Sequence, residues 1–363
     1  MSRGEPIRVT VLIDTYESGQ FIEQAIESVL AQDFPPEQME VLVVDDGSTD
    51  DTAERVRKYG HRVQYLYKAN GGQASAMNYG LERALGEIVA FLDGDDYWLP
   101  GKLTRIMDEF RKSPETGMVY HGFYWCDSAG GQLRKARVSG SSGFIPASPK
   151  DFLSYDLCHP TSTLAFRSSV LQRLLPVPES LVIQADAHLF ACVIFLAPVA
   201  YIDQPLVAYR VHASNASLGW FAGSSMSGDG PHFQGDSDAE ARLRRSVATS
   251  RAIGEGVREW LEKNGFDPNG PDLRPFVMQW SFSARAFEFK LSPPGRLRLS
   301  RYFFDYLRYS RARMGWRFQA VTCINIFASL IVGYNRFRFL EEWPLRLRRF
   351  LGRPVPQKLD EAR

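Results

Sequence analysis

Two hydrophobic periods alternate along the first hundred residues, and this alternation most limits what the chain can fold into. Four short apolar runs have the length and the β-branched content of buried strands: residues 7–13, 40–44, 62–67 and 87–92. Between them, apolar residues recur at helical spacing in three segments: 21–30, 52–59 and 74–85. Such alternation with short links predicts an α/β fold, in which helices flank a mostly parallel sheet.

Beyond residue 100 the pattern loosens, and it predicts a mixed extension of the same sheet. We expect helices at 102–110 and 185–196, strands at 118–125, 133–138, 199–202 and 206–211, and an apolar segment at 163–166. A Gly- and Ser-rich stretch at 219–231 is typical of a flexible link. We therefore expect a first domain over residues 1–217, a loop over 218–238 and a helical, basic region over 239–363.

The net charge of +1 conceals a strong asymmetry along the 363 residues. Residues 291–363 hold 15 Lys or Arg and 5 Asp or Glu, so the remaining 290 residues hold 28 basic and 37 acidic side chains. An apolar run at 320–332 is shorter than the ~18–20 residues of a membrane-crossing helix. Arginines mixed with aromatic residues favour a helix lying on an anionic membrane surface. A solvated basic face is the alternative, and single-stranded nucleic acid is the least favoured partner.

Cysteine usage and the N-terminus indicate a reducing compartment. Cys126, Cys158, Cys192 and Cys323 lie far apart without a CxxC pair, which is unlike a zinc ribbon or a disulfide scaffold. Residues 1–6 lead directly into a strand-like run without the apolar segment of an export signal. We expect a cytoplasmic protein, peripheral at the membrane if its basic region binds there.

Acidic residues stand where two of the expected strands end. Asp45 and Asp46 follow one strand, and Asp93, Asp95 and Asp96 follow another. Open α/β sheets bind ligands at the carboxyl edge of their strands. Carboxylates placed close together repel unless a cation or hydrogen-bond donors offset them, and Mg²⁺ or Mn²⁺ with phosphate oxygens suits such a site. Either motif alone is also compatible with a simple turn.

Taken in order, the motifs of residues 7–216 resemble family 2 glycosyltransferases. The resemblance rests on these segments: Val11–Glu17, Ala25–Gln32, Val44–Asp50, Asn70–Gly72, Asn78–Gly80, Phe91–Pro100, Thr161–Leu164, Ala185–Leu189 and Asp203–Asn215. It implies the nucleotide-sugar-binding GT-A fold and an inverting transfer. It implies a divalent metal (Mn²⁺ or Mg²⁺) and a nucleotide-diphosphate sugar, for which a UDP-sugar is the first expectation. It implies a saccharide or lipid-linked acceptor in the synthesis of cell-surface polysaccharide or glycoconjugate. It implies no nucleic acid.

The resemblance also implies roles for single residues, position by position. Thr15, Tyr16, Asp45 and Asp46 match positions that hold the nucleoside. Asp93 matches the ribose contact of the DxD pair and Asp95 its metal–diphosphate contact. Asp186 matches the general base, and His212 a histidine near the metal or diphosphate. Three further residues are candidate donor or acceptor contacts: Asp96, Trp98 and His159. Packing is an equal interpretation for Trp98.

Several positions depart from the family pattern and keep rival functions open. Asp14 stands where proline is usual, Glu17 where asparagine is common, and Met77 where arginine is frequent. Asp186 lacks its usual acidic neighbour. A catalytically inactive nucleotide-sugar-binding scaffold is therefore one alternative. A nucleotidyltransferase is another, although it would want a basic phosphate loop after the first strand, and no Lys or Arg occurs between Asp14 and Arg55.

Overall fold

The computed structural model describes residues 7–135, 143–145, 159–212, 215, 239–270 and 272–310. The chain forms two compact units, Met1–Ala284 and Arg285–Arg363. The predicted loop over 218–238, the apolar run at 320–332 and the basic residues beyond it lie outside the described residues. The predicted domain boundary at this loop therefore stays a prediction.

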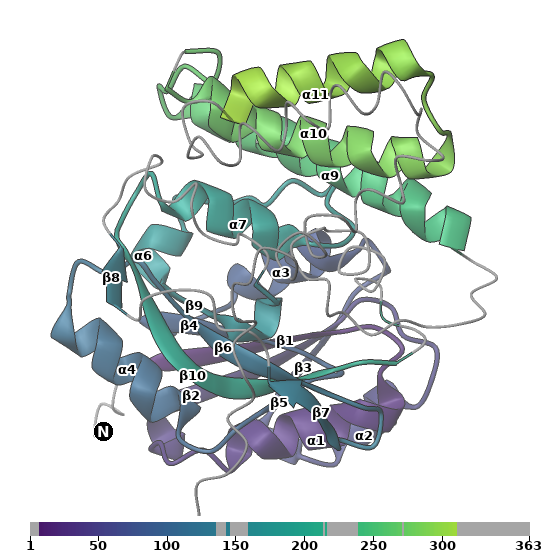
Figure 1. Ribbon diagram of the computed structural model, residues 1–363. Coiled ribbons are helices and arrows are strands. Elements are labelled where there is room, and N and C mark those ends of the chain that lie inside the picture. Colours follow the sequence, from purple (N-terminus) through teal and green to yellow (C-terminus); the bar gives the residue numbers. More distant parts are fainter. Residues whose placement is uncertain are drawn as a thin grey trace, which may run out of the picture. The chain divides into compact units, whose positions relative to one another are not determined.

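One mixed sheet forms the centre of the first unit (Figure 1). Its strand order is β3-β2-β1-β4-β9-β6-β10-β5, with β7 paired to β6 and β8 to β10. The strands are β1 (Val9–Thr15), β2 (Met39–Asp45), β3 (Gln64–Tyr67), β4 (Ile88–Asp93), β5 (Tyr97–Trp98), β6 (Met118–Cys126), β7 (Gln132–Lys135), β8 (Gly143–Ile145), β9 (Leu164–Arg167) and β10 (Val199–Arg210). β3, β2, β1 and β4 run parallel, whereas β9 is antiparallel to both β4 and β6.

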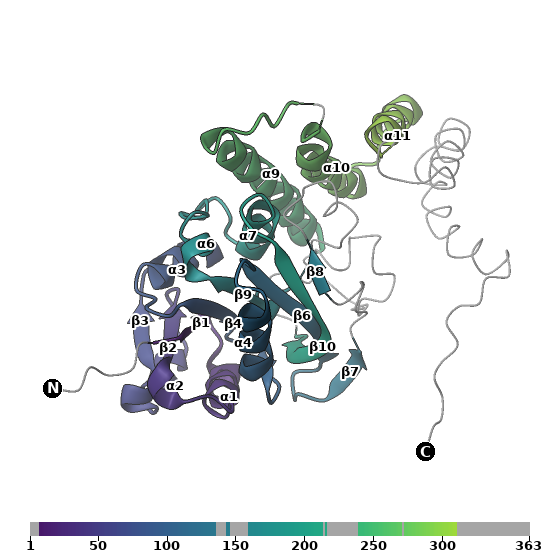
Figure 2. The same ribbon diagram turned by 90° about the vertical axis from the view of Figure 1, so that its left-hand side faces the viewer.

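Helices cover both faces of this sheet and bury two apolar cores. The α-helices are α1 (Gly19–Leu30), α2 (Thr52–Arg57), α3 (Gln73–Leu81), α4 (Lys102–Lys112), α6 (Ser168–Leu171), α7 (Ala185–Val193), α9 (Ala239–Lys263), α10 (Arg274–Leu291) and α11 (Arg296–Ser310). Helices α1, α2 and α4 pack on one face, and α3 and α7 pack on the other, as the two views show (Figures 1 and 2). Alternate residues of the strands supply the two cores, as period-2 side-chain geometry requires.

Parallel pairing brings the strand ends that carry the motifs to one edge. Asp14 of β1 pairs in register with Asp93 of β4, and Thr15 of β1 with Asp45 of β2. Short 3₁₀ turns connect other strands: Pro36–Gln38, Gly60–Arg62 and Thr161–Thr163. The last of these turns precedes β9, and because β9 is antiparallel to β4, Thr161 arrives at the same edge as Asp93.

The structure confirms the predicted mixed sheet and places the second half of the pattern in the same sheet. Its first four strands are parallel as expected, but among the described residues five strand pairs are antiparallel and four are parallel, so the sheet as a whole is not mostly parallel. The two strands expected at 199–202 and 206–211 are instead one strand, β10. Its pairing with β6 shifts register on both sides of Pro205. A proline removes a ladder hydrogen bond, which makes one bulged strand look like two in sequence. Cys126 and Cys192 are free thiols, and both are buried.

The second unit begins within α10 and includes α11. Arg285 pairs with Asp305 at 3.8 Å between Nη1 and Oδ2, and the ring of Tyr302 lies 5.1 Å from that of Phe289. Leu299 is buried, whereas Leu297 and Phe304 are 80% and 60% exposed. Among the described helices, none has the length and apolar character needed to cross a bilayer.

Candidate active site

The acidic pair after β2 is held by a dense set of donors. The Tyr65 hydroxyl donates to Asp45 Oδ2 at 2.6 Å, and the Ser48 backbone N–H donates to Asp45 Oδ1 at 2.7 Å. Asp46 lies beside Lys68, with Nζ 2.7 Å from its Oδ1, and accepts the backbone N–H of Gly72 at 2.7 Å. Gly71 adds a third donor to the same carboxylate. Both side chains are buried, and Asp46 thereby fixes the loop that leads into α3.

Thr15 and Tyr16 lie beside this pair at the end of β1. The Asp46 backbone N–H donates to the Thr15 carbonyl at 2.9 Å, which ties the two strand ends together. Thr15 Oγ1 is buried without a hydrogen-bond partner, whereas the Tyr16 ring is 54% exposed. An exposed ring beside buried carboxylates offers a stacking surface at the sheet edge. Met77, which stands where arginine is frequent, is wholly buried in the core.

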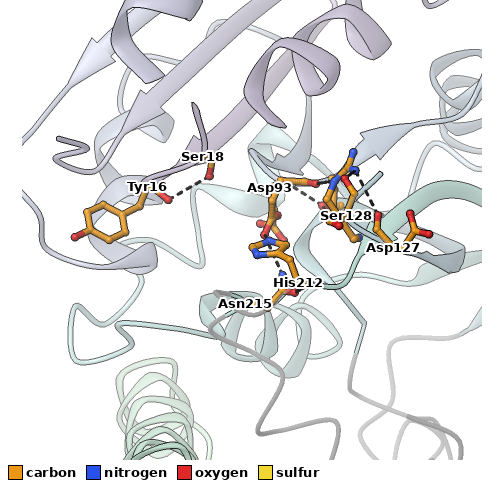
Figure 3. A network of polar contacts seen from close by, with 11 residues as sticks. Tyr16, Ser18, Asp93, Asp127, Ser128, His212 and Asn215 are labelled. Atoms are coloured by element: carbon orange, nitrogen blue, oxygen red, sulfur yellow. Dashed lines mark hydrogen bonds and ion pairs between the residues drawn. The ribbon is translucent and has the colours of Figure 1, made fainter. Parts of the chain in front are cut away.

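The Asp95 carboxylate is bound from the end of β10 by two side chains. His212 Nε2 lies 3.0 Å from Asp95 Oδ2, and Asn215 Nδ2 donates to the same oxygen at 3.0 Å. The Asn215 side-chain carbonyl in turn accepts the backbone N–H of His212 at 2.6 Å. Figure 3 shows His212 and Asn215 converging below Asp93. The two residues predicted for the metal, Asp95 and His212, are thus direct neighbours.

Asp96, the next acidic residue, points into the protein. Its Oδ1 accepts the Arg210 backbone N–H at 2.8 Å, and its Oδ2 accepts the Ser162 hydroxyl at 2.6 Å. Ser162 Oγ also accepts the Asp93 backbone N–H at 3.0 Å. The Asp96 side chain is 1% exposed. Both of its oxygens therefore bind the protein itself, and this placement favours a role in shaping the loop.

Two buried basic side chains, Arg210 and Lys102, contact the acidic loop and its neighbours. The Arg210 guanidinium donates to the Asp95 carbonyl at 2.7 Å and to the Ser128 carbonyl at 2.7 Å, and it stacks on the Phe21 ring at 4.6 Å. Lys102 Nζ donates to the Ser162 carbonyl at 2.5 Å. Burial lowers the pKa of Lys102 well below its ordinary value, against the opposing attraction of nearby Asp96 and Asp93.

The loop offers donors that fit a hard divalent cation. Carboxylate oxygens of Asp93, Asp95 and Asp96 lie within 4.8 Å of one another. Oxygen donors of this kind suit Mg²⁺ or Mn²⁺ when phosphate oxygens complete the coordination. Because Asp96 is fully engaged, Asp95 with its neighbour His212 forms the better-placed pair.

Asp14 adds an unexpected carboxylate to this edge. Its Oδ1 is buried without a hydrogen-bond partner, and its Oδ2 lies 3.5 Å from Gln73 Nε2. Burial raises the pKa of Asp14 to about 7, and repulsion by Asp95 and Asp186 adds to the shift. Burial and repulsion by Asp14 likewise raise the pKa of Asp93 well above its ordinary value. Burial and mutual repulsion therefore favour the protonated forms of Asp14 and Asp93.

Asp186 approaches the same edge from the first turn of α7. Its Oδ1 accepts the Ala187 backbone N–H at 2.8 Å. Burial raises the pKa of Asp186 to about 6, although hydrogen bonds from Ala187 and Thr161 oppose the shift. Its charge contributes to the raised pKa values of Asp14 and Asp93, so these three carboxylates share one electrostatic environment.

The two remaining candidate contacts lie in apolar surroundings. The Trp98 indole is 2% exposed and belongs to a core, with Lys102 Nζ 4.1 Å from its ring centroid. His159 stacks on Phe190 at 5.6 Å and meets the Tyr120 ring at 4.6 Å. Burial lowers the pKa of His159 to about 4. For Trp98, this position favours the packing interpretation.

Sequence reasoning did not single out several residues that complete the site. They are Gln73, Lys102, Ser162, Arg210 and Asn215. Arg210 and Asn215 belong to the segment Asp203–Asn215, which is quoted for the family resemblance, but the resemblance assigns neither residue a role. Gln73 and Lys102 begin helices, where a polar residue is unremarkable in sequence.

Comparisons with known proteins agree with this geometry. The family model of glycosyl transferase family 2 matches residues 10–174. An uncharacterized glycosyltransferase of Nostoc sp. is 34% identical over 58% of this chain and 66% of its own length. One of Mycoplasma pneumoniae is 30% identical over 57% of this chain and 69% of its own length. The chain spans only 35% of the length of two uncharacterized glycosyltransferases from Rickettsia conorii and Rickettsia felis.

Solved structures confirm the GT-A fold. Residues 1–349 of Staphylococcus aureus TarS in complex with UDP superpose with a TM-score of 0.55 at 17% identity, over 93% of this chain and 92% of that one. A mannosyltransferase from Pyrobaculum calidifontis in complex with GDP-Man and Mn²⁺ gives a TM-score of 0.50 at 17% identity, over 96% and 88%. At this identity the likeness concerns the fold.

Proposed function

Because the chain belongs to glycosyltransferase family 2, we propose that it moves a sugar from a nucleotide-diphosphate sugar to a hydroxyl of an acceptor, with inversion at the anomeric carbon. One observation carries the proposal. Asp93 and Asp95, which follow each other closely after β4, lie near Asp186 of the distant helix α7 at the carboxyl edge of one sheet. This is where open α/β sheets bind nucleotides, and the three carboxylates supply the chemistry that the transfer needs.

The nucleoside would bind over the ends of β1 and β2. Thr15 Oγ1 has an unused donor and acceptor, and the exposed Tyr16 ring would stack on the base. Asp45 and Asp46, held by Tyr65 and Lys68, would accept hydrogen bonds from base or ribose with little reorganisation. Asp93 would accept from the ribose.

The diphosphate would lie at Asp95. A divalent cation held by Asp95 and His212 would act as a Lewis acid and stabilise the negative charge on the departing diphosphate. Arg210 holds the Asp95 backbone, and Asn215 holds its carboxylate. These contacts pre-organise the loop, so that little ordering is left for donor binding.

Asp186 would act as the general base. An acceptor hydroxyl attacks the anomeric carbon only as its proton leaves, and a carboxylate on the sugar face opposite the diphosphate can receive that proton. A single displacement of this geometry inverts the centre. The Asp186 pKa of about 6 leaves the side chain mostly ionised at neutral pH, yet more basic than an ordinary aspartate.

For the donor we propose a UDP-sugar, and for the acceptor a saccharide or a lipid-linked saccharide of glycoconjugate synthesis. TarS, whose structure holds UDP, supports the first choice by its likeness in fold. The C-terminal region supports the second. On α11, Leu297, Arg301 and Phe304 follow at i, i+4 and i+7 and are exposed, as a helix at an anionic lipid surface requires. The enzyme would then work peripherally at the cytoplasmic membrane face.

Calorimetry tests the donor site directly. UDP, GDP and dTDP are titrated into the full chain with Mn²⁺, Mg²⁺ or EDTA, and the same series is repeated with Asp95→Ala. We expect metal-dependent binding of one nucleotide, strongest for UDP, and at least about tenfold weaker binding in the variant. Absence of binding in every combination would contradict the proposal.

Transfer is tested with the nucleotide sugars of the base that binds. Turnover by the wild type, lost in Asp186→Asn while the nucleotide still binds, supports the enzyme. Tight binding without any turnover or donor hydrolysis in the wild type would instead favour the inactive scaffold.

A further inference from the structure

The side-chain amide of Gln73 contacts four other elements of the site. Its Nε2 lies 3.0 Å from Thr161 Oγ1 and 3.5 Å from both Asp14 Oδ2 and Asp93 Oδ1. Its Oε1 accepts the backbone N–H of Ala185 at 3.1 Å. Only the oxygen of an amide can accept from a backbone N–H, so this contact fixes which way the amide points.

The orientation of Gln73 determines that of the Thr161 hydroxyl. Because Nε2 is a donor, Thr161 Oγ1 must accept from it, and the single hydroxyl proton remains for another acceptor. The same Gln73 amide binds Ala185, the residue before Asp186, so the Asp186 carboxylate in the first turn of α7 is the neighbouring acceptor. Hydrogen bonding from Thr161 also opposes the rise of the Asp186 pKa. Thr161 is itself 2% exposed, so water does not compete for its proton.

The backbone reinforces the same connection. The Gln73 N–H donates to the Val182 carbonyl at 2.8 Å, and the Ala74 N–H donates to the Leu181 carbonyl at 3.2 Å. These bonds join the start of α3 to the segment that leads into α7. On its other side, α3 is preceded by the glycines that Asp46 binds. The nucleoside side and the base side therefore share one hydrogen-bonded path.

We propose that Gln73 and Thr161 are positioning residues that orient the Asp186 carboxylate relative to the donor carboxylates. In this arrangement Gln73 Nε2 donates to Thr161 Oγ1, and the Thr161 hydroxyl proton would be directed to the Asp186 carboxylate. The proposal rests on the proposed function, because it takes Asp186 as the base. The other titratable groups at this edge are Asp14 on β1, Asp93 on β4, and Asp95 and Asp96 in the loop after β4. Of these, Asp14 and Asp93 lie 3.5 Å from the same Gln73 Nε2 that contacts Thr161.

A matched pair of variants tests the Thr161 hydroxyl. Thr161→Val keeps the shape and removes the hydroxyl, whereas Thr161→Ser keeps the hydroxyl and removes a methyl group. We expect Thr161→Val to lower kcat by roughly 10- to 100-fold, with the KM for the donor changed less than about threefold. Thr161→Ser should recover most of the activity. Gln73→Met, which keeps the length of the side chain, should reproduce the kcat loss.

A second readout needs no substrate. The pKa of the Asp186 carboxyl is followed by carbon NMR of labelled aspartate, assigned with Asp186→Asn. It should rise in Thr161→Val and Gln73→Met and return in Thr161→Ser. An unchanged Asp186 pKa in folded Thr161→Val, or equal kcat in Thr161→Val and the wild type, would overturn the proposal. If the variants shift the Asp186 pKa but the wild type transfers no sugar, the proposed function is contradicted, whereas the positioning of Asp186 by Thr161 and Gln73 is still supported.

Discussion

The Arg210 guanidinium donates from Nε to the backbone carbonyl of Asp95 at 2.7 Å, while the Arg210 backbone N–H binds the Asp96 carboxylate at 2.8 Å. A single buried residue at the end of β10 therefore holds both acidic residues of the loop after β4. Its guanidinium also reaches the Gln24 side chain at 2.5 Å. The loop geometry depends on long-range contacts, and its own turn sequence does not determine it.

Arg210→Lys should weaken this arrangement. Lysine keeps the charge but loses the planar fork, which leaves buried carbonyls without donors. We expect a loss of roughly 2–4 kcal/mol in the free energy of unfolding, measured by urea denaturation in EDTA. Arg244→Lys is the matched control, because Arg244 is 70% exposed on α9, and it should change stability by less than about 0.5 kcal/mol. Equal stability of the two variants would contradict the assignment.

The activity should rise with pH through the pKa of Asp186. The base works only when ionised, and burial raises the pKa of Asp186 to about 6. We therefore expect kcat to increase with pH across that value and then level off. Asp186→Asn should reduce kcat by roughly 10²–10⁴-fold and leave the nucleotide affinity within about threefold. A profile that is flat from pH 5 to pH 8 in the wild type would exclude this base.

Much of the fold follows from hydrophobic periodicity. Over residues 7–92, strand-like and helical hydrophobic periods alternate without interruption. The structure places each strand and helix expected there within a few residues of its predicted bounds. β10 was misjudged, because Pro205 looks like a strand end and local sequence cannot show that β6 accommodates a bulge. Periodicity reports local burial, whereas register depends on partners far away in the sequence.

The site was predictable in part for the same reason. Asp45 and Asp93 end their strands and Asp95 follows β4 directly, positions that the sequence does reveal. That Asp96 points inward could not be predicted, because its partners Ser162 and Arg210 lie 66 and 114 residues away. Gln73 was missed likewise, since its contacts come from β1, β4, the turn before β9 and α7.

Asp14→Asn should stabilise the protein when ligands are absent. Burial raises the pKa of Asp14 from 3.8 to about 7, so the folded state holds a proton that the unfolded chain loses between these values. The contribution of Asp14 to stability is present below pH 4 and is lost as pH rises toward 7. We expect the variant to gain roughly 1–4 kcal/mol at pH 8 in EDTA and little at pH 4. Asp203→Asn, at an exposed site, is the control; an equal gain there would refute the cause.

The exposed stripe on α11 should bind anionic lipid. Leu297→Ser combined with Phe304→Ser removes apolar area that would enter the interface, and we expect roughly tenfold weaker binding to phosphatidylglycerol vesicles in co-sedimentation. Leu133→Ser, where the side chain is 49% exposed in the other unit, should leave binding unchanged. Wild-type protein that ignores these vesicles at low salt would exclude the membrane surface as a partner.

Gly72→Ala tests the junction between the nucleoside side and α3. Gly72 has φ +85°, and a Cβ there would lie 2.6 Å from the Val182 Cα. Gly60→Ala is the matched control, because Gly60 has φ +57° but open space around the added methyl group. The backbone strain is common to both, so only Gly72→Ala should also push the segment that leads into α7 away from α3.

We expect about 1 kcal/mol of lost stability in Gly60→Ala and roughly 2–4 kcal/mol in Gly72→Ala, by urea unfolding. Only Gly72→Ala should lower kcat, because Asp186 follows the displaced segment. If both variants lose the same stability and the same activity, the added methyl group at Gly72 does not displace that segment, and the prediction is wrong.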